Sequence, residues 1–414
     1  MTTYNAPGIY IQNKNSSHRS IKAVSTSTAC FLGQATEGPL NEYICIASIA
    51  DFNLQFGVLN TPLGIAVQQF FIHGGSRTYI CRVGQLINLN ELDDFFDPNK
   101  IRVKTPLTED YLTQIEALKH LKLLPDEDIN MLIFPEITWN STEEKRIILA
   151  AIEYCEQTKN CMVIFDLPLN VDITNLRGIT ELQLPSTSYA AVYHPYLSIQ
   201  NPNFSLEKAP SNIPQTINIP NSSSIAGLWA KNDNSRGVWK APAGINYPLV
   251  NLTNLQVDIS ESQQALLNPV GINCIRNLPN HGQVVWGART LLSELNSELH
   301  YISVRRTLNM IETSLIKGLS WTVFEPNTAI LWSNIRSRIS AFLAELFRNG
   351  AFQGSKANDA YFIQCGLGET MTQADIEQGN IIVIVGVAMI KPAEFSVIKS
   401  RFQVISAISK LSCK

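Results

Sequence analysis

Residues 129–168 read INMLIFPEITWNSTEEKRIILAAIEYCEQTKNCMVIFDLP, and this stretch decides the fold class. Its two apolar runs, 129–136 and 161–168, have the length and aliphatic content of buried strands. Residues 142–158 between them are helical in character, with Glu143 and Glu144 in the first turn, where the helix dipole favours acidic side chains. A strand, a helix and a second strand in this order predict parallel pairing with a helix on the face of the sheet.

The same alternation continues on both sides of this stretch. The sequence predicts further strands over 27–35, 43–49, 77–83 and 189–197, and further helices over 62–73 and 108–122. Residues 200–220 are instead rich in Asn, Pro and Ser, which predicts a surface connection. The first half of the chain is therefore expected to be an α/β unit with a mainly parallel sheet.

The second half shows a different rhythm. A helix is expected over 328–349, because Pro326 and Asn327 open it, apolar residues recur at helical spacing and Gly350 closes it. Another long helix is expected over 299–317. Strands are expected over 273–279, 283–290, 319–324, 360–366, 380–390 and 394–405. We therefore predict a second domain of α+β type, with a domain boundary near Val250.

Composition limits the functions that are open to this chain. Of its 414 residues 45% are hydrophobic and 16% are charged, against about 25% charged in typical soluble domains. This low charge fraction suggests that much of the surface lies against other protein. A net charge of −3 gives no basic field for nucleic acid. The eight cysteines are scattered without zinc spacing, which indicates reduced, buried thiols.

No targeting or membrane segment is expected. The N-terminal twenty residues lack the apolar stretch of a secretory signal. Residues 381–390 form an apolar run of about half the length that a bilayer requires, so we interpret them as a buried strand.

Motifs for chemistry are missing. The segment GAFQGSKA (350–357) has the wrong spacing and context for a phosphate loop, and neither GxSxG nor HExxH occurs. The six histidines are dispersed, so no metal site or catalytic triad is indicated. Arg305 and Arg306, followed by Glu312, allow a phosphate or carboxylate clamp, an interface ion pair or an intramolecular one. We expect no catalytic residue, no cofactor and no metal.

Several segments resemble one known family. They are PGIYIQ (7–12), STSTACFLGQATEGPLN (25–41), GLWAKNDNSRGVWKAPAG (227–244), LNPVGINCIRNLPNHGQVVWGART (267–290), YISVRRTLNMIETSLIKGLSWTVFEPN (301–327) and MTQADIEQGNIIVIVGVAMIKPAEF (371–395). Together they are similar to the contractile tail sheath family of phage tails, tailocins, extracellular contractile injection systems and type VI-like machines. The resemblance covers nearly the whole chain except about 88–220.

The resemblance implies a division into three parts. An N-terminal arm (1–22) joins an inner sheath domain (251–414) that ends in a C-terminal strand arm. An outer α/β domain (23–250), with a variable segment (88–220), is inserted between them. The implied fold class is an α+β inner domain with an inserted α/β outer domain, mixed sheets, and terminal strands that are exchanged between subunits.

The resemblance also implies a function. Such subunits form hexameric rings that stack helically around an inner tube and contract to drive that tube through a target envelope. The implied partners are further copies of the chain, the inner tube protein, baseplate and terminal cap proteins, and sheath paralogues, without nucleic acid or direct membrane insertion. The protein would be made in a bacterial cytoplasm and assembled into a phage tail-like or injection-system particle, cytoplasmic or released.

The candidate contact residues follow from this resemblance together with the strand pattern. Strands that could add to a neighbour's sheet lie in the two arms: Gly8, Ile9, Tyr10 and Ile11, and Phe395, Val397, Ile398, Phe402 and Val404. A short polar helix is expected to face the tube, through Thr372, Gln373, Asp375, Glu377 and Gln378. The alternative is an α/β ligand-binding protein or enzyme with a cleft at the strand ends of its sheet.

Overall fold

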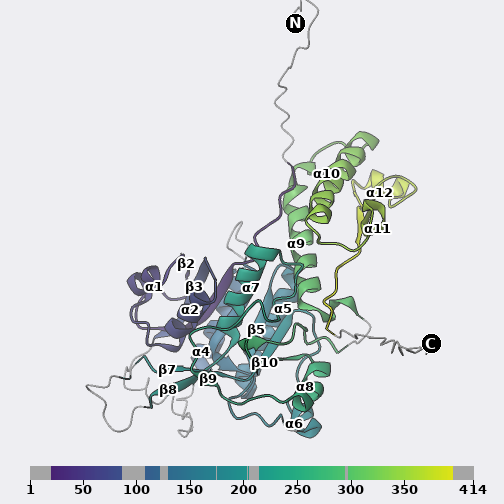
Figure 1. Ribbon diagram of the computed structural model, residues 1–414. Helices are drawn as coiled ribbons and strands as arrows, with labels where there is room; N and C mark the ends of the chain where they lie inside the picture. The colour runs from purple at the N-terminus through teal and green to yellow at the C-terminus, as the bar shows by residue number, and fades with distance from the viewer. Residues whose placement is uncertain are drawn as a thin grey trace, which may run out of the picture.

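A computed structural model of the chain describes residues 20–85, 108–121, 129–173, 175–202, 204, 214–293 and 297–394. Figure 1 shows a large layered body from which one long helix, α9 (Ile302–Gly318), extends. The helices α10 (Ala329–Arg348), α11 (Ala357–Ala360) and α12 (Gln373–Glu377) gather beside the far part of α9. The layered body and this smaller helical part share α9 as their connection.

The body is built on an eight-stranded sheet in the order β11-β10-β6-β5-β4-β1-β3-β2. The six inner strands are parallel, while β2 and β11 pair antiparallel at the two edges. Their bounds are β1 (Ala29–Ala35), β2 (Tyr43–Ile46), β3 (Thr78–Gln85), β4 (Met131–Thr138), β5 (Met162–Asp166), β6 (Ala190–His194), β10 (Ile272–Leu278) and β11 (Gly282–Val285).

Helices cover both faces of this sheet, because its central strands are apolar on both sides. Successive residues of β1, such as Phe31 and Leu32, enter different cores. The first core lies under α1 (Ile49–Phe56), α2 (Pro62–Ile72) and α7 (Ser222–Arg236). The second lies under α4 (Thr108–Leu121), α5 (Thr142–Thr158), α6 (Leu176–Glu181) and α8 (Glu261–Leu267). The predicted α/β class is confirmed, including the strand, helix and strand within 129–168.

Two expectations for the middle of the chain need correction. Residues 200–220 are not only a connection, since β8 (Thr216–Ile219) forms a three-stranded sheet with β7 (Leu197–Gln200) and β9 (Asn254–Leu255). The expected boundary near Val250 falls inside the layered body, because β10 pairs with β6 from Ile272 to Cys274. Residues 272–285 thus belong to the main sheet and not to the part that follows it.

The smaller part has a separate apolar core. It joins α9, α10 and the antiparallel pair β12 (Tyr361–Gln364) and β13 (Ile384–Val387). The long helix expected over 328–349 is confirmed as α10. The strand expected over 319–324 is wrong, because Ser320–Thr322 is a 3₁₀ turn at the end of α9. Two further 3₁₀ turns, Asn268–Val270 and Glu298–His300, lie before β10 and before α9.

A buried carboxylate joins the sheet to α7. Asp166, the last residue of β5, is 1% exposed, and its Oδ1 accepts hydrogen bonds from the backbone N–H groups of Asn221 and Ser222 at 2.9 and 3.1 Å. Burial raises the pKa of Asp166 to about 6, against the lowering effect of these hydrogen bonds. The start of α7 is therefore held by a side chain that titrates in the mildly acidic range.

This arrangement predicts a pH-dependent stability. The folded chain keeps the Asp166 proton up to pH about 6, whereas the unfolded chain releases it near pH 4. The folded state then binds more protons in this window, so the contribution of Asp166 to stability is complete below pH ~4 and lost as the pH rises through about 6. Relative to Asp166→Asn, the wild-type free energy of unfolding should fall by about 3 kcal/mol as the pH rises from below ~4 to above about 6. Urea titrations of both proteins at each pH measure the difference, and parallel pH profiles would contradict the assignment.

Candidate assembly surfaces

The residues expected in the two arms lie outside the described part of the chain. These are Gly8, Ile9, Tyr10, Ile11, Phe395, Val397, Ile398, Phe402 and Val404. The structure does describe residues 20–22, the end of the expected N-terminal arm, and Glu394, the first residue of the strand expected over 394–405; we call Ser20 and Glu394 the N-terminal and C-terminal exit points. Both points are fixed by specific contacts.

The N-terminal exit point is held along α9. Ile21 is buried against Gly318 of α9. A Cβ atom at position 318 would come within 2.8 Å of the Ile21 side chain, so a residue larger than glycine does not fit there without a shift. The backbone N–H of Val24 donates to Ser314 Oγ at 3.0 Å. Residues 20–26 are thus attached to the side of α9 near its C-terminal end.

The C-terminal exit point is held near the opposite end of α9. Glu394 accepts hydrogen bonds from Nε and Nη2 of Arg289, at 2.9 and 2.5 Å from its Oε2. Lys391 pairs with Glu298, just before α9, at 2.9 Å. Because α9 has 17 residues, the two exit points are separated by about 25 Å along its axis.

A two-stranded sheet with open edges lies in the smaller part of the chain. Within the described residues, β12 and β13 pair only with each other, from Tyr361↔Val387 to Gln364↔Ile384. An isolated two-stranded sheet has only marginal stability in water. This one is stabilised because one of its faces packs against α10. Phe362 and Ile384 remain 54% and 44% exposed. Such an edge presents unpaired backbone groups and can accept another strand.

The short polar helix expected to face the tube is present as α12. Thr372 caps it, and Asp375 Oδ2 accepts from the backbone N–H and the hydroxyl of Thr372, at 2.8 and 2.6 Å. These hydrogen bonds lower the pKa of Asp375. Four of the five expected contact residues are exposed: Thr372, Gln373, Glu377 and Gln378. The fifth, Asp375, is partly buried. Asp375 therefore maintains the helix, whereas Glu377 is exposed and, within the described residues, its carboxylate accepts only an exposed hydrogen bond from Gln373, at 3.2 Å.

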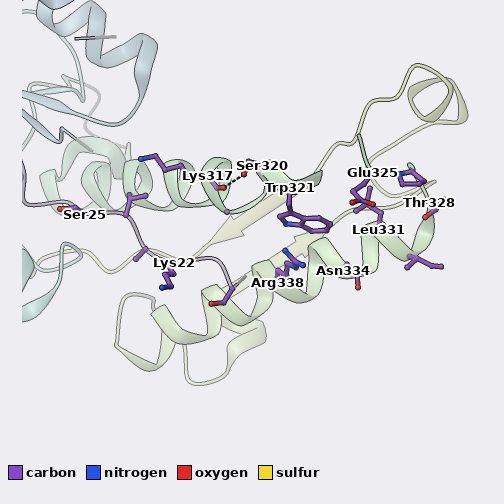
Figure 2. A pocket seen from close by; sticks show the side chains of 16 residues that line it. Lys22, Ser25, Lys317, Ser320, Trp321, Glu325, Thr328, Leu331, Asn334 and Arg338 are labelled. Carbon is purple, nitrogen blue, oxygen red and sulfur yellow. Dashed lines mark hydrogen bonds between the residues drawn. The ribbon is translucent and has the colours of Figure 1, made fainter. Parts of the chain in front are cut away.

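An open groove lies between the ends of α9 and α10, with a volume of about 1290 Å³. Residues 20 and 22–25 line one side of it, and Figure 2 shows the side chains of Trp321 and Arg338 next to each other in its lining. The Arg338 guanidinium lies 3.9 Å from the centre of the Trp321 ring. The groove belongs to the same end of the molecule as the N-terminal exit point.

Four large apolar side chains in and near this part of the chain are exposed to solvent. Phe324 is fully exposed and has a positive φ of 72°, an unusual conformation for an aromatic residue. Ile316 and Ile330 are 74% and 75% exposed, and Val323 is 62% exposed. We call these four residues the apolar tip. Large exposed apolar side chains between the last turn of α9 and the first turn of α10 are a candidate surface for contact with another molecule.

The arginines singled out from the sequence are buried inside the chain. Arg306 pairs with Asp233 of α7 at 2.6 Å, donates to the Thr26 carbonyl at 2.7 Å and lies 4.6 Å from the Trp229 ring centre. Arg305 donates to Asn309 at 2.8 Å, and its guanidinium lies over the ring of Tyr189. Glu312 is half-buried on the same helix. For Arg306, the structure therefore gives the intramolecular alternative and not an interface ion pair.

A ligand cleft at the strand ends is not supported by the geometry. Next to β4, the space lined by Pro62, Pro135 and Pro220 has a volume of only about 10 Å³. In the described ranges no three His, Cys, Asp or Glu residues are placed to hold a metal ion. Among those residues, too, no helix combines the length and apolar composition needed to cross a membrane.

Open strand edges on β12–β13 and the exposed apolar tip are features of a protein that makes contacts with other proteins. Residues 106–291 match the family described as phage tail sheath protein central domain, and residues 294–403 match the phage tail sheath C-terminal domain. The chain belongs to the contractile tail sheath family. Its relatives are structural tail sheath proteins, which confirms that it is not an enzyme.

Solved sheaths are similar over nearly the whole chain. The PVC sheath complex of an extracellular contractile injection system, in its contracted state, is 30% identical, with 98% of this chain and 99% of that one covered and a TM-score of 0.72. The contracted helical sheath of the anti-feeding prophage is 28% identical, with 97% and 100% covered and a TM-score of 0.73. The tail sheath protein of Enterobacteria phage T4 is 31% identical, but the match spans only 20% of that relative.

Some contact residues were missed by sequence reasoning. Asp233 was not identified, because its partner Arg306 is 73 residues away and nothing in the spacing joins them. Arg289 and Glu394 were missed for the same reason. Phe324 and Val323 were assigned to a strand, although Pro326 and Asn327 directly after them are a turn signal. That signal could have indicated an exposed turn.

The Arg306–Asp233 pair generates a double-mutant prediction. Both side chains are almost fully buried, at 4% and 2% exposed, and burial raises the pKa of Asp233 even though Arg306 opposes this shift. Arg306→Met should cost about 3–5 kcal/mol of unfolding free energy, because it leaves a buried carboxylate without its partner. The double variant with Asp233→Leu should cost less than Arg306→Met alone. Denaturant unfolding of the single and double variants measures both effects, and strictly additive losses would show that the two groups do not act as a pair.

Proposed function

We propose that this chain is the structural subunit of a contractile sheath that polymerises as helically stacked hexameric rings around an inner tube. Contraction of this polymer would drive the tube through a target envelope. The single observation that carries the proposal is the two-stranded β12–β13 sheet, which pairs with no further strand among the residues that the structure describes. The contracted PVC and anti-feeding prophage sheaths, which this chain matches over nearly its full length, support it.

Strand exchange would provide the link between subunits. The arm pattern at Gly8 to Ile11 and at Phe395 to Val404 suits strands that add to the β12–β13 sheet of a neighbour, where backbone hydrogen bonds give affinity. The two exit points lie at opposite ends of α9. If the arm of each subunit binds the β12–β13 sheet of the next subunit, the contact is head-to-tail. Such a contact can be repeated from subunit to subunit and gives a helical polymer instead of a closed dimer.

The apolar tip would form a second contact between copies of the chain. Phe324, Val323, Ile316 and Ile330 are exposed in the isolated chain, and their burial against a neighbour would be favourable by about 25 cal/mol per Å². Such a contact is made by whole bodies and not by arms. It can therefore change when the bodies rotate, while the exchanged strands keep the subunits connected.

Energy for contraction would be stored in the packing of the polymer. A rearrangement between two packings that are separated by a barrier needs no nucleotide, and the described residues contain no phosphate loop. The chain would act with the inner tube, baseplate and terminal cap proteins and with sheath paralogues. It would be made in a bacterial cytoplasm and function in a phage tail-like or injection-system particle.

Removal of the N-terminal arm tests the assembly. The purified wild-type chain should form striated hollow tubes in negative-stain micrographs. Deletion of residues 1–19 should abolish them, and replacement of these residues by a Gly/Ser linker of equal length should abolish them too, because the linker cannot supply the apolar alternation of a strand. Circular dichroism should show an unchanged fold, since the contacts of Ile21 and Val24 with α9 remain. Normal tubes from either variant would refute strand exchange, and a monomeric wild-type protein under all salt conditions would refute the sheath itself.

Charge reversal on α12 tests the tube contact. Glu377→Lys is the informative change, because Glu377 is exposed and takes no part in the cap made by Thr372 and Asp375. We expect about tenfold less sheath to co-sediment with the inner tube protein, which corresponds to about 1.4 kcal/mol. Glu345→Lys, an exposed reversal on α10, is the matched control and should co-sediment normally. Equal loading by the two variants would show that α12 does not face the tube.

A further inference from the structure

Five of the cysteines converge in one core, on the face of the main sheet that α5 covers: Cys274 on β10 and four others. Cys30 and Cys81 lie on β1 and β3, Cys155 lies in the last turn of α5, and Cys161 directly precedes β5. All four are buried and free. With the exception of Cys155 and Cys161, the members of each pair among these four are 51 to 131 residues apart in the sequence, so the fold and not the local sequence brings most of them together.

This group of thiols is not a metal site. Among the residues that the structure describes, no three potential ligands are placed to hold one ion. The geometry instead singles out one pair, since the Sγ atoms of Cys155 and Cys161 are 2.9 Å apart. A disulfide bond is about 2.05 Å long, so these two sulfur atoms are less than about 1 Å from bonding distance.

The turn between α5 and β5 positions this pair. Lys159 ends the helix in the left-handed conformation, with a φ of 55°, and its backbone N–H donates to the Cys155 carbonyl at 2.8 Å. The chain then reverses within two residues, which brings Cys161 back beneath the last turn of the helix. The hydroxyl of Thr158 lies 3.7 Å from the Cys161 sulfur. The closeness of the two sulfur atoms therefore results from a defined turn.

We propose that Cys155 and Cys161 are a redox modification site, which closes to an intramolecular disulfide when the chain meets a small oxidant such as hydrogen peroxide. The other three thiols of this core stay reduced. The bond would connect the end of α5 to the start of β5, inside the layered body and away from the apolar tip and α12. It does not depend on the sheath function proposed above.

The chemistry balances with peroxide as the oxidant. One of the two sulfurs, as thiolate, attacks a peroxide oxygen, the O–O bond breaks, and hydroxide leaves to give a sulfenic acid. The second sulfur then attacks the sulfenic sulfur, the S–O bond breaks, and a second hydroxide leaves. The two thiol protons combine with the two hydroxides. Two thiols and one peroxide thus give one disulfide and two waters.

Burial determines the rate of this reaction. Desolvation raises the pKa of the Cys155 thiol, and contact with Cys161 raises it further. The thiolate is therefore scarce at neutral pH, so oxidation should be slow and should accelerate as the pH rises. Reduced glutathione at cytosolic concentrations would keep the pair open, whereas an oxidising surrounding would let it close.

Peptide mapping gives a direct test. Trypsin cleaves after Arg146, Lys159 and Arg177, so the two cysteines fall on separate peptides, 147–159 and 160–177, each with one cysteine. After peroxide treatment of the full chain, then denaturation with a maleimide present, mass spectrometry should find these peptides joined, lighter by two hydrogens than their sum and without maleimide. Dithiothreitol should separate them. The unfolding midpoint should also rise by about 2–5 °C on oxidation and fall back on reduction.

Two variants give the controls. Cys155→Ser should yield peptide 160–177 with a sulfenic acid or a maleimide adduct and no joined peptide, while Cys274→Ser, a buried thiol of β10, should oxidise as the wild type does. If Cys155→Ser does not fold, the wild-type map alone still decides. Maleimide on both peptides after prolonged oxidation, or a disulfide that joins Cys30 to Cys81 instead, would overturn the proposal. Normal sheath tubes from a chain without the disulfide would leave the proposed function intact.

Discussion

The buried guanidinium of Arg306 is the contact on which the arrangement of the whole chain depends. It binds Asp233 on α7, the Thr26 carbonyl of the entering chain and the face of Trp229 in the core of the main body. One side chain of α9 thus joins the layered body, the N-terminal segment and the helix that carries the smaller part. The desolvation free energy of two buried charges offsets much of their Coulomb attraction. Such a pair therefore contributes more to the choice of one packing arrangement than to the net stability of the fold.

The described chain is held by specific contacts near both of its ends. The N-terminal segment is packed along α9 near Gly318, and Arg289 holds Glu394 near the other end of the helix. A load that a neighbour applied to either arm would therefore reach a folded body and not a loose loop. The surfaces that remain open, β12–β13 and the apolar tip, lie in the smaller part, where a small core leaves strand edges and side chains uncovered.

At the carboxyl ends of the central strands, side chains of the described part of the chain make contacts within the body. In open parallel sheets, ligands bind beyond the carboxyl ends of the strands. Here Asp166 at such an end is used to hold the start of α7, and prolines close the space next to β4. Charged groups that could serve chemistry are instead used to fix helices on the sheet.

The sequence by itself determined the periodic elements: the strands and helix of 129–168, the helix α10 and the family. Local periodicity and caps fix such elements because they depend on neighbours three or four residues away. Only the tertiary structure decided that β10 and β11 extend the main sheet, that Arg306 binds Asp233, and that Asp375 caps α12 while Glu377 stays exposed. Those outcomes depend on which distant surfaces meet and exclude water, and one sequence carries no periodic signal for a contact between residues 233 and 306.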